Sequence, residues 1–493
     1  MMTDHLFAAA DLGATSGRII LGHLDDGCFL LEEVYRFPTP TFTDAGHLHW
    51  DAVDLLGHII HGVRQSSANG VLEGVGVDTW GVDYARLDSS GRLLEQPFNY
   101  RDSRTNGVPE AFFSDFSPQE FYATAGLQVM EFNTIFQMVS SAHDPDWINA
   151  QTCLFLPDLF TYWLSGAKNA ELTVASTSGL LDVSSRQWSD ITVNHLRDRY
   201  RLDLAPRLPD IVEPGTIVGQ IRSEILPAPT PVIAVASHDT ASAIVSVPAS
   251  TRNFAYISSG TWSLVGLELD RPILTEESRQ ADFTNELGID GTVRYLRNVM
   301  GLWVLSESQR FWEDQGLESH LLELLHEAWH LPALTTVIDM QDPRLLPPGD
   351  MPSRLAQMAR ETGQRVPQNP AEFTRCILDS LALGYRRVIR QAIQLANAEV
   401  DVVHIVGGGC RNRLLNQLTA DATGLTVISG PAEGTALGNL LVQARAVGAF
   451  NGTLMDLRHI SLASCELITY TPGLFPLTQT TWDQAEQRAF GTL

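Results

Sequence analysis

The 493-residue sequence contains almost no lysine: Lys168 is the only one, beside 32 arginines. A Walker-A loop needs a lysine directly after its glycine-rich run, and a protein kinase needs one on a strand. Lys168 follows Ser165-Gly166-Ala167 and fits neither pattern, and Schiff-base chemistry would have no other residue to use. If the protein handles a nucleoside triphosphate, backbone amides, arginines, hydroxyls and a metal ion must therefore hold the phosphates.

Cysteine and long apolar runs are also scarce. The cysteines are scattered, without a C-x-x-C spacing, at Cys28, Cys153, Cys376, Cys410 and Cys465. This pattern favours a reducing compartment and excludes a disulfide framework or a zinc site. Residues 1–7 lack the cationic start of a secretory signal, and no apolar run approaches transmembrane length. We therefore expect a cytoplasmic protein with no membrane partner.

Basic residues are outnumbered by acidic ones, which gives a formal net charge of −25. Such a chain lacks the basic footprint that nucleic acids and anionic membranes require, so we expect no nucleic-acid partner. Apolar residues make up 44% of the sequence and charged residues 18%, which is typical of a globular protein. The length fits two large domains or three ordinary ones.

A strand-turn-strand pattern occurs twice. The first consists of residues 6–10, a turn at 11–18 and residues 19–22; the second consists of 254–257, a turn at 258–261 and 262–266. The two turns start 247 positions apart, about half of the chain. This spacing indicates two α/β domains of like topology that arose by duplication, although serine-, glycine- and threonine-containing hairpins are common enough for a coincidence.

Strands and helices alternate between the hairpins. Residues 74–80 and 231–236 have strand patterns, and an apolar residue every fourth position from Phe373 to Ile393 predicts a long amphipathic helix. The alternation indicates layered α/β domains. We place the boundary before the second hairpin, which gives an N-terminal domain of residues 1–247 and a C-terminal domain of residues 248–493.

The first hairpin turn, DLGATSGR at residues 11–18, has the composition of a phosphate site. Converging backbone N–H groups can cradle phosphate oxygens, and Thr15 and Ser16 add hydroxyls. Arg18 adds a fixed charge, and Asp11 could hold Mg²⁺ through water because that ion dehydrates reluctantly. The same glycines would also serve an ordinary β-turn.

Two glycine-rich turns lie in the C-terminal half. Residues 403–412 pass from an apolar strand into three glycines and then into a helix that Asn412 can cap, and residues 429–439 contain three more glycines. Glycine lets a flat ring or a phosphate touch the backbone. We interpret the two turns as walls of a nucleotide site, the alternative being tight strand-to-helix packing.

A carboxylate follows a strand at residues 236–242, where Asp239 stands between His238 and Thr240. An aspartate with an ordinary pKa of about 3.9 is a base at neutral pH. Phosphoryl transfer needs little more, because the hydroxyl proton leaves late in a loose transition state. Asp239 is therefore the candidate general base, unless it only caps the following helix.

Polar and aromatic residues are mixed at residues 76–84 and 99–106, as sugar sites require. Their carboxylates, Asp78 and Asp83 among them, can grip hydroxyls while an aromatic face covers the C–H side of a ring. Half of this cluster could be ordinary strand-exit chemistry, and Asp78 and Asp83 could equally be solvated.

Together these segments resemble the carbohydrate kinases of the FGGY family. The matching stretches, in register over nearly the whole chain, are residues 11–18, 77–83, 100–107, 236–242, 258–264, 298–303 and 405–410. The resemblance implies two actin-like ATPase domains with a ribonuclease-H-like core and a central cleft. It also implies that the N-terminal domain binds mainly sugar and that the C-terminal domain binds mainly ATP.

The resemblance also assigns roles to individual residues. Asp239 takes the general-base role. The substrate-contacting positions are Gly81, His238, Asp239, Thr240 and Asn298. The nucleotide positions are Ala14, Thr15, Ser16, Gly17, Arg18, Thr261 and Gly408. Ser306 stands where relatives have a glutamine, so an ATP contact there is open between Ser306 and Gln309.

The activity that the resemblance implies is transfer of a phosphoryl group from MgATP to the 1-hydroxyl of L-rhamnulose, in L-rhamnose degradation. The partners are then a ketose and ATP, and the protein is a monomer or a small homo-oligomer. Two alternatives remain open. One is a kinase of this family for another ketose, such as fuculose or xylulose, and the other is a non-catalytic actin-like ATP-binding module.

Overall fold

The computed structural model describes residues 5–491, which form two compact units. Unit 1 comprises residues 1–250, 269–295 and 434–465, and unit 2 comprises residues 251–268, 296–433 and 466–493, in each case for the described residues. Two segments of the C-terminal half thus pack with the N-terminal half. None of the helices in residues 5–491 is both long and apolar enough to span a lipid bilayer.

Unit 1 is built around a six-stranded sheet of order β13-β14-β6-β1-β2-β3. Its strands are β1 (His5–Leu12), β2 (Ser16–Asp25), β3 (Cys28–Pro38), β6 (Gly74–Thr79), β13 (Thr216–Gln220) and β14 (Pro231–Ala234). The antiparallel pair β1–β2 is the predicted first hairpin, and β1 also pairs in parallel with β6, which pairs in parallel with β14.

Helices cover both faces of this sheet because β1 is apolar on both sides. Leu6, Ala8, Ala10 and Leu12 join the core under α1 (Ala52–Ser67) and α5 (Leu156–Ser165). Phe7 and Ala9 join the core under α8 (Asp239–Val245), α15 (Gly434–Ala446) and α16 (Leu454–Ser464). This alternation is the two-residue period of a strand buried on both faces.

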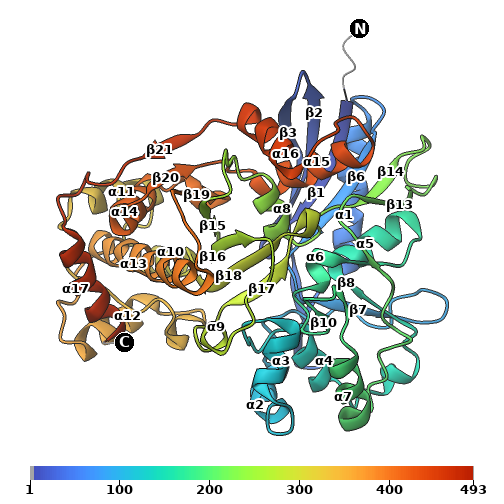
Figure 1. The fold of residues 1–493 in the computed structure, drawn as a ribbon, viewed down its shortest axis with the longest axis horizontal. Coiled ribbons are helices and arrows are strands. Elements are labelled where there is room, and N and C mark those ends of the chain that lie inside the picture. The colour runs from blue at the N-terminus through green and yellow to red at the C-terminus, as the bar shows by residue number, and fades with distance from the viewer. Residues whose placement is uncertain (1–4, 492–493) are drawn as a thin grey trace. The chain divides into compact units, whose positions relative to one another are not determined.

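The helices α15 and α16 come from the far end of the chain, and sequence patterning gave no sign that they cover this sheet. Figure 1 shows them in red against the blue strands β1, β2 and β3. Gly438 lets α15 approach α8, since a Cβ at this position would lie 1.8 Å from the carbonyl oxygen of Ser242. The interpretation of the 429–439 glycines as a nucleotide wall is therefore wrong for Gly438, whose function is helix packing.

A second apolar core of unit 1 lies among the shorter elements. The shorter helices of unit 1 are α2 (Val108–Phe112), α3 (Pro118–Ala125), α4 (Thr134–Ser140), α6 (Leu172–Ala175), α7 (Asp190–Tyr200) and α9 (Glu276–Gln280). The small strands are β4 (Thr41–Asp44), β5 (His47–Trp50), β7 (Tyr84–Leu87), β8 (Thr152–Phe155), β9 (Ala170–Glu171), β10 (Leu181–Asp182), β11 (Gln187–Trp188) and β12 (Ile211–Val212).

The second large sheet has seven strands in the order β17-β18-β16-β15-β19-β20-β21. They are β15 (Phe254–Ser259), β16 (Trp262–Leu269), β17 (Thr284–Leu287), β18 (Val293–Met300), β19 (Val402–Val406), β20 (Thr426–Ser429) and β21 (Ile468–Tyr470). β15 pairs antiparallel with β16, the predicted second hairpin, and in parallel with β19, which pairs in parallel with β20. The first sheet has the same succession of pairings, which supports the duplication.

Helices of unit 2 surround one long central helix. They are α10 (Trp303–Asp314), α11 (Leu321–His330), α12 (Met351–Glu361), α13 (Pro370–Ala396), α14 (Arg413–Thr423) and α17 (Gln479–Phe490). The predicted helix from Phe373 to Ile393 is α13, which is buried along most of its length.

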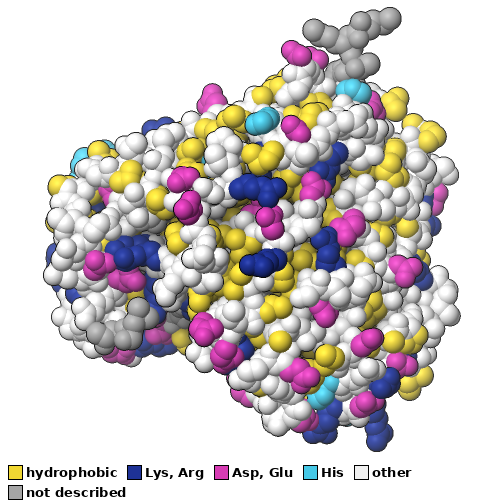
Figure 2. All heavy atoms as spheres, viewed as in Figure 1, with side chains coloured by type: hydrophobic (Ala, Val, Ile, Leu, Met, Phe, Trp, Pro, Cys, Tyr) yellow, Lys and Arg dark blue, Asp and Glu magenta, His cyan; other side chains and the backbone are white. Residues whose placement is uncertain are grey.

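The acidic side chains of the protein are scattered over the face viewed in Figure 2.

Candidate functional site

Asp239 lies where β14 has ended and α8 begins. His238 is the N-cap residue and Asp239 opens the first turn, so Asp239 does not have the capping role that the sequence left open. Its side chain is 32% exposed, and its Oδ1 accepts hydrogen bonds from the Thr240 N–H at 2.6 Å and the Thr240 hydroxyl at 3.1 Å. Burial raises the pKa of Asp239, and the charge of Asp11 adds to the effect.

A buried carboxylate that the sequence analysis missed holds the backbone before Asp239. Glu171 Oε2 accepts from the Ser237 N–H at 3.1 Å and from the Thr173 hydroxyl at 2.6 Å, and this hydroxyl accepts from the His238 N–H at 3.2 Å. The Thr79 N–H completes the connection by donating to the Ser237 carbonyl at 3.0 Å. Burial raises the pKa of Glu171 to about 7. The signal in the sequence that could have revealed Glu171 is a single charged residue among uncharged neighbours.

The first hairpin turn joins β1 to β2. The Gly13 N–H donates to the Ser16 carbonyl at 3.1 Å, and Thr15 is exposed at the tip between the half-buried Ala14 and Ser16. Gly17 is buried against Phe37, whose ring a Cβ would meet at 2.3 Å. Arg18 donates from both Nε (3.0 Å) and Nη2 (2.8 Å) to Asp11 Oδ2, so the two charged candidates of this turn contact each other.

Asp11 and Asp78 are direct neighbours on the parallel strands β1 and β6. Asp78 is fully buried: its Oδ2 accepts from the Asn439 amide at 2.6 Å, and its Oδ1 has no hydrogen-bond partner. Burial, followed by the charge of Asp11, raises the pKa of Asp78 well above its ordinary value, and the charge of Asp239 adds to the effect. The structure therefore concentrates three carboxylates in one electrostatic neighbourhood.

The Asp11 carboxylate, with Asp78 beside it, fits a divalent cation. Carboxylate oxygens are hard ligands of the kind that Mg²⁺ prefers, and one of them, Asp78 Oδ1, lacks a partner. Among the His, Cys, Asp and Glu side chains of the described residues, one group of three has all its ligand atoms within 4.8 Å of one another. This group is Glu95, Asp144 and Asp146, so the three carboxylates above do not form a direct metal site. Binding through water, which Mg²⁺ commonly keeps, is accordingly the mode that Asp11 suits.

Asp83 organises an aromatic cluster instead of projecting toward a ligand. Its Oδ2 accepts from the indole N–H of Trp50 at 2.6 Å and of Trp80 at 2.8 Å, and its Oδ1 accepts from the Gln137 amide at 2.9 Å. The neighbouring Val82 has a φ of +67°, which a β-branched residue rarely adopts. Asp83 is fully buried, so the expectation that it grips a hydroxyl is wrong, and its partners show why.

Gly81, the candidate sugar contact of this segment, is buried beside Thr177, whose hydroxyl oxygen a Cβ would meet at 3.0 Å. The Val82 N–H donates to the same hydroxyl at 3.2 Å. A side chain at position 81 would therefore disturb the turn that follows β6.

Unit 2 brings two of the predicted nucleotide residues together. Thr261 lies in the turn between β15 and β16, and Gly408 follows β19, the parallel neighbour of β15. Gly409 packs on β15, where a Cβ would lie 2.0 Å from Ser259 Oγ, whereas a Cβ on Gly408 would meet nothing within 4 Å. Gly408 is therefore exposed backbone that an approaching ring or phosphate can touch.

The remaining candidates of unit 2 lie on β18 and α10. Asn298 is half-buried near the end of β18. Gly301 follows it and packs on the second hairpin, where a Cβ would lie 2.7 Å from the carbonyl oxygens of Gly260 and Thr261. Ser306 is exposed on α10, and Gln309 donates its amide to the Ser319 carbonyl at 2.8 Å.

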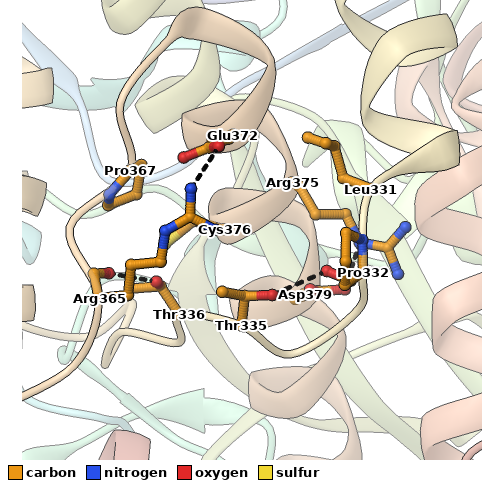
Figure 3. Close-up of a pocket in the computed structure, with 10 residues that line it drawn as sticks. All are labelled: Leu331, Pro332, Thr335, Thr336, Arg365, Pro367, Glu372, Arg375, Cys376 and Asp379. Carbon is orange, nitrogen blue, oxygen red and sulfur yellow. Dashed lines mark hydrogen bonds and ion pairs between the residues drawn. The ribbon is translucent and has the colours of Figure 1, made fainter.

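A small cavity in unit 2 contains none of the predicted site residues. Figure 3 shows its lining, in which Arg365 contacts Glu372 and Arg375 contacts Asp379. Both arginines are thus matched by carboxylates, at 2.7 Å and 3.0 Å. The cavity offers no net charge for an anion, and we assign it no role.

The sequence profiles of known families match most of the chain. Residues 6–246 match the N-terminal domain of the FGGY family of carbohydrate kinases, and residues 255–447 match its C-terminal domain. The chain belongs to this family and is a carbohydrate kinase. The rhamnulokinase of Bacteroides thetaiotaomicron is 40% identical over 486 residues, 97% of each chain, and that of Enterococcus faecalis is 40% identical over 450 residues, 90% of this chain and 89% of the relative.

Solved structures give the same fold. The xylulose kinase of Lactobacillus acidophilus has a TM-score of 0.80 at 15% identity and covers 98% of this chain and 96% of its own. The glycerol kinase of Plasmodium falciparum, solved with ADP, has a TM-score of 0.79 at 13% identity and covers 99% of both chains. The expectation of the two-domain, actin-like kinase fold is thereby confirmed.

Proposed function

We propose that the protein transfers a phosphoryl group from ATP to the 1-hydroxyl of L-rhamnulose, giving L-rhamnulose 1-phosphate and ADP in L-rhamnose degradation. The observation that carries this proposal is the agreement of several curated rhamnulokinases with the chain over most of its length, at about 40% identity. The environment of Asp239 supports the chemistry, because it is a partly exposed carboxylate at the start of a helix.

Asp239 is the general base in this proposal. The Thr240 N–H and hydroxyl orient its Oδ1, and the carboxylate aligns the sugar hydroxyl and takes its proton as the bond to phosphorus forms. A raised pKa suits a base that must receive a proton late and release it afterwards. We assign the sugar contacts to Gly81, His238, Thr240 and Asn298.

The phosphate groups of ATP are held by residues 14–18, Thr261 and Gly408 in this proposal. The exposed hydroxyl of Thr15 and the open face of Gly408 support these assignments. We accordingly take residues 1–247 as the mainly sugar-binding domain and residues 248–493 as the mainly ATP-binding domain. Asp11 would hold Mg²⁺ through water, and the ion would neutralise phosphate charge that the single lysine cannot.

A panel of ketoses tests the substrate. ADP release is followed with ATP and Mg²⁺ and with L-rhamnulose, L-fuculose, D-xylulose or no sugar. L-rhamnulose should give a kcat/KM at least about tenfold above that of the other sugars. Each of the other sugars is expected to lose one or more hydrogen bonds between a hydroxyl and the site. A higher kcat/KM for another ketose would show that L-rhamnulose is not the preferred substrate. ADP release that no sugar stimulates would contradict the kinase assignment.

The variant Asp239→Asn tests the base. It keeps the shape of the side chain but cannot accept the proton, so kcat should fall by about 10²–10⁴-fold while the affinity for ATP stays near that of the native protein. Nucleotide affinity is measured by equilibrium titration. Near-normal turnover in this variant would contradict the assignment.

We also propose a cytoplasmic location, which the scattered cysteines without a C-x-x-C spacing support because thiols persist in a reducing compartment. A monomer or a small homo-oligomer is proposed for solution, and the measurement is molar mass by light scattering.

A further inference from the structure

Three buried ionisable side chains of unit 1, those of His238, Glu286 and Arg294, lie in a row beside Asp239. His238 Nε2 lies 3.3 Å from Asp239 Oδ1, and Nδ1 of the same ring lies 3.2 Å from Arg294 Nη2 and 3.4 Å from Glu286 Oε2. Arg294 Nη1 and Glu286 Oε2 form an ion pair at 2.9 Å. The side chains of His238, Glu286 and Arg294 are only 9%, 7% and 1% exposed, so water does not screen these contacts.

The arginine determines which nitrogen of His238 carries the proton. A guanidinium group donates hydrogen bonds and accepts none, so Nδ1 must accept from Arg294 with its lone pair. The proton of the neutral ring is then on Nε2, the nitrogen that faces Asp239. With the opposite tautomer the Nδ1 N–H would face the guanidinium group, and the Nε2 lone pair would face Asp239 Oδ1, another acceptor, at 3.3 Å. Glu286 Oε2 lies 3.4 Å from Nδ1 but makes no hydrogen bond, so it does not favour that tautomer.

Glu286 orients the arginine. Arg294 contacts three groups: Nε donates to the Leu287 carbonyl at 3.2 Å, Nη1 pairs with Glu286, and Nη2 reaches His238. Burial opposes ionisation of Glu286, but the charge of Arg294 holds its pKa below the ordinary value. A buried ion pair gives little stability compared with an apolar pair of the same volume, so its position beside the base needs another explanation.

We propose that Glu286 and Arg294 are positioning residues of the phosphoryl transfer: they hold His238 with its proton on Nε2, and this N–H orients the Asp239 carboxylate toward the substrate hydroxyl. The inference rests on the proposed function for the identity of the reaction. The protonation of His238 in the resting protein can be measured without any turnover, however.

The first test measures the ring directly. Protein labelled with ¹⁵N in histidine is observed by NMR, and the His238→Gln variant identifies the signals of His238. The native protein should show an unprotonated Nδ1 and a protonated Nε2. A protonated Nδ1 would overturn the inference and would leave the proposed substrate untouched, whereas failure of the ketose panel would leave this spectrum unchanged.

The second test removes the pair without leaving a buried charge. In Glu286→Gln/Arg294→Met, kcat should fall about tenfold to 100-fold with the KM for ATP within about twofold, because only a contact to the base is lost. His238 should then show signals of both tautomers. The single variant Arg294→Lys keeps a charged donor, so its kcat should lie between that of the native protein and that of Glu286→Gln/Arg294→Met.

A matched control addresses stability. Arg375 and Asp379 in unit 2 form an equally buried ion pair at 3.0 Å, with side chains 3% and 1% exposed. The variant Arg375→Met/Asp379→Asn removes this pair at a place with no contact to His238. If it lowers kcat as much as Glu286→Gln/Arg294→Met does, or if the latter keeps native kcat and a single tautomer, the positioning role is refuted.

Discussion

The closest helix contact of unit 1 yields a quantitative prediction. In Gly438→Ala the new Cβ would lie 1.8 Å from the Ser242 carbonyl oxygen and 2.6 Å from its carbon, both backbone atoms that cannot rotate away. The helices α8 and α15 must therefore separate. Overpacking of this kind costs about 1–3 kcal/mol or more, whereas replacing a helical glycine by alanine gains only about 1 kcal/mol, so the steric cost exceeds the gain.

We expect the free energy of unfolding of the protein to fall by up to about 2 kcal/mol, measured by urea titration with circular dichroism. Gly384→Ala is the control, since Gly384 is also helical but a Cβ there meets nothing within 4 Å. This variant should gain about 1 kcal/mol. Because α8 begins at Asp239, Gly438→Ala should also lower kcat. If Gly438→Ala is as stable as the native protein while Gly384→Ala is stabilised, the close approach of the helices is refuted.

Two further predictions concern Glu171 and Gly408. The folded-state pKa of Glu171 is about 7, above the ordinary value of 4.5, so its stabilising contribution is complete below pH 4.5 and is lost as the pH rises through 7. Glu171→Gln should remove about 3 kcal/mol of this pH dependence between pH 4.5 and 7.5 in urea titrations, and an unchanged slope would exclude Glu171 as its source. Gly408→Ala should unfold within about 0.5 kcal/mol of the native protein but raise the KM for ATP several-fold without affecting that for the ketose, whereas an unchanged KM for ATP would exclude contact between the nucleotide and Gly408.

Local patterns predicted the elements that carry the candidate site. Both hairpins, the strand before Asp239 and the long helix α13 occur where the sequence indicates them, because each is encoded by neighbouring residues. Asn412 caps α14 as expected, accepting from the Leu415 N–H at 3.1 Å. Such features depend on turn chemistry and on the spacing of apolar residues, both of which can be read within a short window.

Contacts between distant segments could not be predicted in this way. Glu171, Glu286 and Arg294 reach residues 237–238 from segments about 50 to 70 positions away, and α15 joins a sheet that begins at His5. Asp83 was misread for the same reason: its chemistry suits a sugar site, but donors from Trp50 and Gln137 surround it. A polar residue beside a strand has the same sequence signature whether it faces a ligand or an internal partner.

The three neighbouring carboxylates have different surroundings, which suit them to different roles. Asp11 forms an ion pair with Arg18 at 2.8 Å. Asp78 is fully buried with its pKa raised well above the ordinary value, so it is protonated over a wider pH range and adds less repulsion to its neighbours. Asp239 alone combines a carboxylate partly open to solvent with donors on one oxygen. Acid and base roles are assigned where groups of the same type differ in protonation because their environments differ.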